Sequence, residues 1–172
     1  MILGLDISTS ITGATIIDDS GNIIYNEAWD TRKYKNFFQK AEEIRKHLAS
    51  LPVVPSRIYV EQSLQSFRSG FSSAKTLSTL SRFNGVVSWI CYKLFGIEPE
   101  YIAATSARKE CGIKISRGTK AKEVVLKYVI DNVPEVMVEY TKHGNPKPAS
   151  FDRADSYVVA QAGYNLCQRQ KS

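Results

Sequence analysis

The sequence is poor in the residues that usually bind zinc or form disulfide bonds. It contains two histidines and three cysteines in 172 residues. His47 and His143 are far apart, and no Cys-x-x-Cys pair occurs, so nothing in the sequence indicates a zinc site. An odd number of cysteines, at positions 91, 111 and 167, favours free and mostly buried thiols in a reducing cytosol.

The sequence also lacks a long apolar run. No stretch approaches the roughly 20 apolar residues that a membrane-spanning helix needs, so we expect no association with a membrane. The apolar stretch at the start is short and contains Asp6, so we expect no secretory signal peptide. Because internal repeats, low-complexity tracts and an obvious linker are absent from the sequence, residues 1–172 are expected to form a single domain.

Acidic residues are fewer than basic ones. The chain has 23 Lys and Arg against 17 Asp and Glu, a formal net charge of +6, with 43% hydrophobic residues. This composition is typical of a globular domain. An excess of positive charge favours a polyanionic partner such as nucleic acid, although many basic proteins have none.

Apolar patterning predicts a mixed α/β domain, mostly of three layers. Strands are predicted at residues 1–8, 14–18, 23–28, 57–61 and 98–103, and the first three are expected to form an antiparallel meander because turns at 10–13 and 18–22 join them. Helices are predicted from Asn36 as a cap to Pro52, and at 74–94, 106–111, 119–133 and 151–168, with a Pro-bearing loop at 142–150.

Four carboxylates interrupt these apolar patterns. Asp6 lies within the first strand and Glu61 ends the fourth, while Asp152 and Asp155 lie three residues apart on one face of the last helix. A carboxylate in a buried strand is costly unless a cation or a donor meets it. Carboxylates suit Mg²⁺, and two such ions can activate water and stabilise the leaving oxygen of a phosphodiester.

Asp152 and Glu61 also have a simpler interpretation, as exposed acids that bind no metal. Asp152 could instead be an exposed acid near the start of a helix, where the helix dipole favours negative charge. Glu61 would face solvent if its strand lay at the edge of the sheet. Asp6 and Asp155 have mostly apolar neighbours, which makes an exposed position harder to support.

In these motifs the chain resembles the RuvC-type Holliday junction resolvases of the ribonuclease H-like superfamily. The matching segments are Gly4-Leu5-Asp6-Ile7-Ser8 with Thr12-Gly13, then Val60-Glu61-Gln62, and finally Asp152-Arg153-Ala154-Asp155-Ser156, in an order that fits to about Gly163. The resemblance implies a ribonuclease H-like mixed five-stranded sheet, three antiparallel strands and then two parallel ones, flanked by helices. Phage and viral versions are similarly divergent, so the resemblance covers them as well.

The resemblance also implies which residues form the active site. It assigns two divalent ions, Mg²⁺ with Mn²⁺ expected to substitute, to Asp6, Glu61, Asp152 and Asp155. A basic residue near the scissile phosphate corresponds to Lys122, with Lys120 as the second candidate. Both lysines are also what a solvated helix start would contain.

Further residues are implied as DNA contacts. The family wedges the junction with an apolar side chain after the Glu-Gln pair, and inserted side chains of this kind unstack bases. Leu64, Phe67 and Phe71 are the candidates for the wedge, or else core residues of the next helix, and Arg68 and Lys75 are candidates for phosphate contacts. The chain departs from the family in having no aromatic residue directly after Gln62 and a longer loop at 142–150.

The function implied is that of a structure-selective endonuclease. It would resolve four-way DNA junctions by paired symmetric nicks that leave 5′-phosphate and 3′-hydroxyl ends, and would act as a homodimer. The helix at 74–94 is the expected interface, although its apolar stripe, from Leu77 to Leu94, is also what a core helix would contain. We expect it in the cytoplasm of a bacterial cell, or of a host cell if the protein is viral. The alternatives are a broader nuclease for flaps, branched DNA or RNA–DNA hybrids, and a nucleic-acid-binding protein without activity.

Overall fold

One mixed β-sheet forms the centre of the protein. The computed structural model describes residues 1–62 and 74–171. The strands are β1 (Ile2–Asp6), β2 (Ile11–Ile17), β3 (Ile23–Asp30), β4 (Arg57–Glu61) and β5 (Glu100–Ile102), and they lie side by side in the order β3-β2-β1-β4-β5. The first three strands pair antiparallel, whereas β1, β4 and β5 run parallel. This arrangement confirms the predicted sheet.

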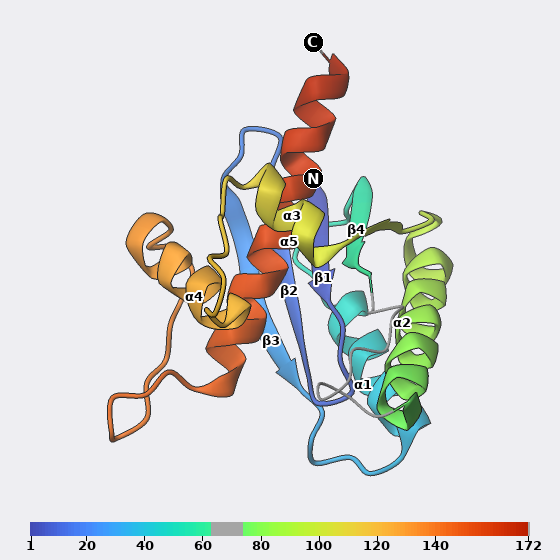
Figure 1. The fold of residues 1–172 in the computed structure, drawn as a ribbon. Helices are drawn as coiled ribbons and strands as arrows, with labels where there is room; N and C mark the ends of the chain where they lie inside the picture. The colour runs from blue at the N-terminus through green and yellow to red at the C-terminus, as the bar shows by residue number, and fades with distance from the viewer. Residues whose placement is uncertain (63–73, 172) are drawn as a thin grey trace.

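Helices cover both faces of the sheet (Figure 1). They are α1 (Phe37–Ala49), α2 (Ala74–Phe95), α3 (Ala104–Glu110), α4 (Ala121–Asn132) and α5 (Pro148–Lys171). The pair α1 and α2 packs on one face, and α5 lies across the other face with α3 and α4 beside it. The domain therefore has three layers, as predicted.

The alternation of side chains along β1 divides the core in two. Leu3 and Leu5 point into the cluster that α1 and α2 cover, whereas Ile2 belongs to the cluster under α5. Asp6 follows Ile2 and Gly4 in the period of two and therefore faces α5. In β4, Tyr59 packs in the α5 cluster while Ile58 and Val60 pack on the opposite side, so Glu61 also faces α5.

The structure differs from the predicted elements at three places. The predicted turn at 10–13 is wrong, because β2 already begins at Ile11 and the turn is closed by the side chain of Ser8, which accepts from the backbone of Ser10 and Ile11. The predicted loop at 142–150 ends early, because α5 begins at Pro148, where proline suits the first turn of a helix. The helix predicted from residue 119 begins at Ala121, after Lys120 in an extended conformation.

The cysteines of the chain are free. Cys91 and Cys167 are buried and Cys111 is half-buried, as the spacing predicts. Among the helices in the described residues, none is both long and apolar enough to cross a membrane.

Candidate metal centre

Two of the four acids come from neighbouring parallel strands. In the register of β1 and β4, Leu5 lies opposite Val60, so the next residues, Asp6 and Glu61, end the two strands side by side. The backbone around Glu61 is fixed on both sides, because its carbonyl accepts from the Asn84 side chain and the amide of Gln62 donates to Ile102. The carboxyl ends of two strands thus present both acids toward α5.

The other two acids reach the site because α5 lies directly on the sheet. A Cβ atom at Gly13, which pairs with Asp6, would collide with the carbonyl group of Asp152, and one at Gly4 would collide with the backbone of Ala160. The buried hydroxyls of Thr15 and Ser156 lie 2.8 Å apart across the same contact. Only glycine on the sheet allows this approach, which sets Asp152 and Asp155 above the end of β1.

Burial and neighbouring charges shift the pKa values of the four carboxylates. Desolvation raises the pKa of Asp6 well above its ordinary value, and the charges of Glu61 and Asp155 raise it further. Desolvation followed by the charge of Asp155 raises the pKa of Glu61 to about 7, and desolvation raises that of Asp152 to about 6. The pKa of Asp155 is also raised by desolvation. These raised pKa values indicate buried carboxylates and, at Asp6 and Glu61, additional repulsion by neighbouring negative charge.

Nearby basic side chains partly compensate this charge. The Nζ atom of Lys122 lies 3.3 Å from Oδ2 of Asp155. Desolvation lowers the pKa of Lys122, but the charges of Asp155, Asp6 and Asp152 together outweigh it and the pKa is raised. The guanidinium of Arg108, on α3, also lowers the pKa values of Glu61 and Asp155.

The carboxylates fit divalent ions by the chemistry of their donors. None of the described residues donates a side-chain hydrogen bond to the carboxylates of Asp6 or Glu61, so their oxygen atoms are available as ligands. Four carboxylates with one close ammonium would be relieved by Mg²⁺, which prefers oxygen ligands. In the described part of the chain, no three His, Cys, Asp or Glu side chains are already arranged so that they could hold a metal ion.

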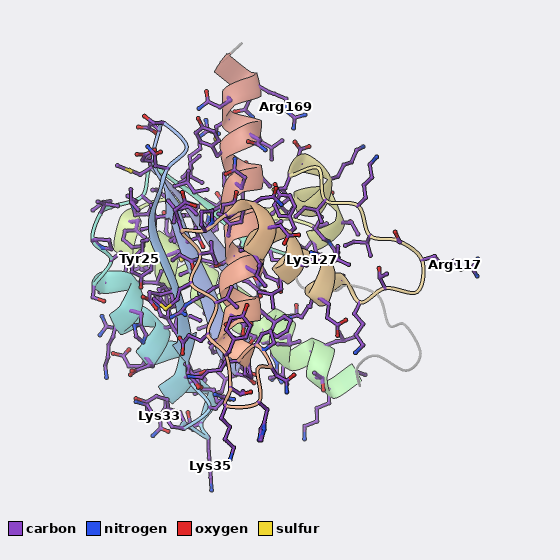
Figure 2. The ribbon with its side chains drawn as sticks, turned by 90° about the vertical axis from the view of Figure 1, so that its left-hand side faces the viewer. Tyr25, Lys33, Lys35, Arg117, Lys127 and Arg169 are labelled. Carbon is purple, nitrogen blue, oxygen red and sulfur yellow. The ribbon has the colours of Figure 1, made fainter. Side chains whose placement is uncertain are left out.

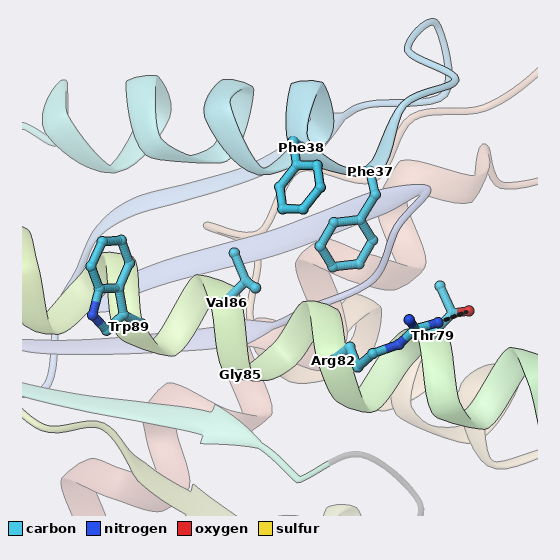
Figure 3. Close-up of a pocket in the computed structure, with 7 residues that line it drawn as sticks. All are labelled: Phe37, Phe38, Thr79, Arg82, Gly85, Val86 and Trp89. Carbon is cyan, nitrogen blue, oxygen red and sulfur yellow. Dashed lines mark hydrogen bonds between the residues drawn. The ribbon is translucent and has the colours of Figure 1, made fainter.

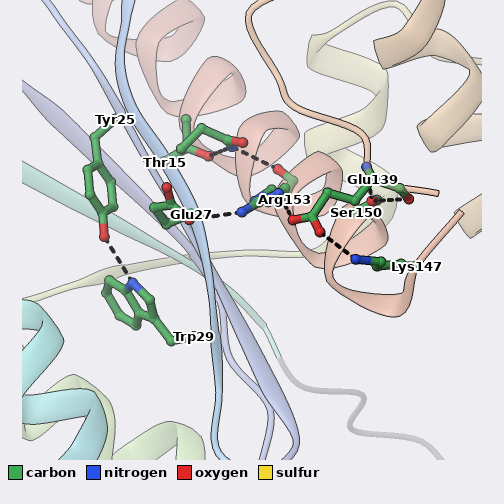
Figure 4. Close-up of polar contacts among 9 residues, drawn as sticks. Thr15, Tyr25, Glu27, Trp29, Glu139, Lys147, Ser150 and Arg153 are labelled. Carbon is green, nitrogen blue, oxygen red and sulfur yellow. Dashed lines mark hydrogen bonds and ion pairs between the residues drawn. The ribbon is translucent and has the colours of Figure 1, made fainter. Parts of the chain in front are cut away.

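A buried arginine holds the start of α5 in place (Figure 4). Arg153, between the two acids of α5, donates to Glu27 on β3 and to Glu139 in the segment before α5, each at 2.9 Å. The side chain of Asn26 donates to Thr15 and to the carbonyl of Arg153. Lys147 also pairs with Glu139 at 2.9 Å. Asp152 and Asp155 are thereby tied to the sheet through the residue between them.

The remaining predicted contacts are more dispersed. Lys120 is exposed and pairs with Glu123 at 3.1 Å rather than with the acids. Lys75 is exposed in the first turn of α2. The predicted contacts Leu64, Phe67, Arg68 and Phe71 lie outside the described residues.

The sequence did not single out Arg108 or Arg153 as part of this site. Arg108 lies in a short helix without a motif, and its position near Glu61 depends on how α3 packs against α5. Arg153 lies inside the Asp-x-x-Asp motif, where an arginine would ordinarily be expected to reach solvent. The only available signal was the acidic residues elsewhere in the sequence, and nothing in their spacing identified Glu27 and Glu139 as its partners.

An apolar groove lies on the opposite layer, between α1 and α2 (Figure 3). It has a volume of about 710 Å³ and is lined by Phe37, Phe38, Thr79, Arg82, Gly85, Val86 and Trp89. Phe38 is 72% exposed and Trp89 is 61% exposed. The predicted apolar stripe of α2 is mainly core, since Phe83, Val87 and Ile90 are buried. The exposed aromatic face is therefore a different one.

Three solved structures with the same fold are two of RuvC and one of a mitochondrial Holliday junction resolvase. Thermus thermophilus RuvC in complex with a Holliday junction substrate matches with a TM-score of 0.67 and 13% identity, over 98% of this chain and 94% of that chain. Thermus thermophilus RuvC in a second structure matches with a TM-score of 0.64 and 15% identity, over 98% and 96% of the two chains. The yeast mitochondrial Holliday junction resolvase Ydc2 matches with a TM-score of 0.62 and 14% identity, over 99% of this chain and 80% of that one.

These matches establish the fold, which is that of RuvC and is ribonuclease H-like. No protein-family model and no curated protein sequence matches the chain. Since a fold does not determine an activity, function has to be argued from the site.

Proposed function

We propose that this chain, which has the RuvC fold, is a divalent-metal-dependent endonuclease that resolves four-way DNA junctions. Paired symmetric nicks would leave 5′-phosphate and 3′-hydroxyl ends. The observation that carries the proposal is the convergence of Asp6, Glu61, Asp152 and Asp155, with raised pKa values and few donors. The similar solved structures, one of them a complex with a Holliday junction, support the choice of substrate.

The proposed roles follow from the position of each group. Asp6 and Glu61 would hold divalent ions from the sheet, and Asp152 and Asp155 would hold them from α5. When bound, two Mg²⁺ ions, for which Mn²⁺ would substitute, supply Lewis acidity and an activated water. Lys122 would neutralise charge on the scissile phosphate, because its ammonium already lies among the acids and would be released by metal binding.

The predicted DNA contacts belong to the same proposal. Lys75 begins the helix that follows the 63–73 segment, and its exposed ammonium would bind a phosphate. Lys120 would bind a phosphate beyond the one that Lys122 contacts. Within the undescribed segment, Arg68 is proposed as a phosphate contact, and Leu64, Phe67 and Phe71 stay candidates for the wedge.

Paired nicks require two active sites, and we propose a homodimer joined through α2. The support for this is the exposed apolar face of that helix, on which Trp89 is 61% and Tyr92 53% exposed, since large exposed apolar patches commonly mark interfaces. Sedimentation should give a dimer for the wild-type protein. The variant Trp89→Glu/Tyr92→Glu should sediment as a monomer, and an unchanged dimer would exclude this face.

The function is tested by cleavage of an end-labelled four-way junction with Mg²⁺. Splayed-arm DNA, linear duplex and an RNA–DNA hybrid serve as parallel substrates. We expect paired nicks at symmetric positions in the junction and little cutting of the other substrates. Equal cutting of flaps or hybrids would support a broader nuclease with the same metal centre.

Two variants separate catalysis from binding. Asp6→Asn and Glu61→Gln should abolish cleavage and still bind the junction, because each removes a metal ligand without removing a cation. Normal cutting by either variant would exclude the proposed metal centre. Junction binding without any cutting by the wild-type protein, at any Mg²⁺ or Mn²⁺ concentration, would identify a binding protein instead.

A further inference from the structure

The loop between β3 and α1 carries a group of exposed cations. Within the sequence Thr31-Arg32-Lys33-Tyr34-Lys35-Asn36, the three basic residues are all exposed, and no acid lies among them. In Figure 2, Lys33 and Lys35 project away from the body of the protein at one end of the sheet. The loop thus presents positive charge to the solvent.

The loop is firmly attached to the turn that follows Asp6. Thr31 is fully buried, its amide donates to the carbonyl of Ser10 at 2.9 Å, and its hydroxyl donates to the carbonyls of Thr9 and Ser10. The ammonium of Lys40, on α1, also donates to the carbonyl of Thr9. Because both ends of the loop are held to the same turn, its cations have a defined position relative to β1.

That position is at the end of the sheet where β1 ends in Asp6. The turn that holds Thr31 follows β1 directly, and β3 ends at Asp30, opposite Ile11. The positive charge of Arg32 also acts on Asp152. The cations of the loop therefore lie at the same end of the sheet as the acids.

The lysines of the loop have little internal compensation. Arg32 is held by Asp30, with Nη2 2.5 Å from Oδ2. Lys33 lies 4.9 Å from the centre of the Tyr34 ring, whose hydroxyl donates to Glu43. Lys35 forms no ion pair with any of the described residues. By contrast, Lys46 and Lys127 each pair with an acid of their own helix.

We propose that Lys33 and Lys35, with Arg32 beside them, bind the DNA backbone next to the scissile phosphate. This inference rests on the proposed function and adds to it the direction in which the bound strand leaves the metal centre, toward β3 and α1. Lysine ammonium groups on an anchored loop suit phosphates, which they bind without reading sequence.

The test is the salt dependence of DNA binding, measured by fluorescence anisotropy with Ca²⁺ in place of Mg²⁺. Each lost phosphate contact lowers the slope of log Kd against log salt by about 0.9 for duplex DNA. The variant Lys33→Ala/Lys35→Ala should therefore lose about 1.8 of the wild-type slope, on both junction and linear duplex. The charge-preserving variant Lys33→Arg/Lys35→Arg should keep the wild-type slope.

The matched control is Lys46→Ala/Lys127→Ala, which changes the net charge equally and is expected to leave the slope unaltered. An equal loss of slope in the control would show that the slope depends only on net charge, and it would overturn the proposal. An unchanged slope in Lys33→Ala/Lys35→Ala would overturn it as well. The assay measures binding and not cleavage, so it tests the loop even if the protein is not a nuclease. Absence of any DNA binding by the wild-type protein would overturn both.

Discussion

The ammonium group of Lys122, near the start of α4, lies 3.3 Å from a carboxylate oxygen of Asp155 on α5. The lysine side chain is 62% exposed and the aspartate side chain 14% exposed. A half-exposed cation therefore reaches from solvent into a group of acids that are fixed to two strands and one helix. In the proposed mechanism, this ammonium would contact a phosphate once metal ions compensated the acids.

Replacement of Lys122 should affect chemistry more than binding. Lys122→Met is expected to lower the single-turnover cleavage rate by about 100-fold, in the range found when one charge-stabilising donor is removed. Junction affinity should change little. Lys120→Met is the control, since Lys120 pairs with Glu123, and its rate should stay close to that of the wild-type protein. Equal losses in the two variants would assign both lysines to general DNA binding.

The acids should make the metal-free protein less stable as the pH rises. Their folded-state pKa values are raised, to about 7 for Glu61 and about 6 for Asp152, so the folded protein binds protons more tightly than the unfolded chain. This contribution to stability is complete below the ordinary pKa near 4 and is lost as the pH rises through 6 to 7. Calorimetry in EDTA should give a lower Tm at pH 8 than at pH 5.5, and Mg²⁺ should restore it at pH 8.

Glu61→Gln separates this effect from other titrations. It removes one of the crowded charges, so its metal-free Tm at pH 8 should exceed that of the wild-type protein, and the stabilisation by Mg²⁺ should disappear. Glu98→Gln, at an exposed position, should behave like the wild-type protein. A metal-free Tm that is lower in Glu61→Gln would contradict the proposed crowding of charge.

The contact between α5 and β2 should not tolerate a methyl group. Gly13→Ala would force α5 away from the sheet and is expected to lower the free energy of unfolding by about 1–3 kcal/mol. It should also raise the Mg²⁺ concentration that gives half-maximal cleavage, because Asp152 moves with the helix. Gly85→Ala, in α2 with open space around its Cβ position, should stabilise the protein by about 0.5–1 kcal/mol. Urea denaturation measures both.

The two acid partners of Arg153 should show a strong coupling. Either Glu27→Ala or Glu139→Ala leaves the buried guanidinium with one acid partner, and each should lower the Tm only slightly, since both acids are partly exposed. The double variant leaves the guanidinium without an acid and should lose about 3–5 kcal/mol. Additive losses in a double-mutant cycle would exclude the shared role of the two acids.

The four acids could be identified as candidates because they interrupt apolar patterns, and their binding of metal stays a prediction. Asp6 and Glu61 stand at the ends of buried strands, and Asp152 and Asp155 share a helical face, so local periodicity was enough to indicate their orientation. The sheet was predictable from the short apolar runs of β1 and β4, which are typical of buried strands. These features depend only on neighbours in the sequence.

Features that depend on tertiary packing could not be predicted. Thr12 and Gly13 are typical of a turn, yet both lie inside β2. Glycine occurs at position 13 because a side chain there would collide with the backbone of α5. Arg153 is buried only because Glu27 and Glu139 approach it from other elements. Arg32 acts on the acids because the loop between β3 and α1 packs near them, and Arg108 does so because the short helix α3 packs near them.

The glycine contacts beneath α5 also bear on how such a protein can diverge. At Gly4 and Gly13 the backbone of the sheet contacts the backbone of α5, and Gly163 contacts the Tyr59 ring. The distance between α5 and the sheet therefore depends little on branched side chains. Many substitutions in either core could then accumulate without displacing the four acids. Such a scaffold can retain its fold while its sequence drifts, which is compatible with 13–15% identity between chains that superpose over almost their whole length.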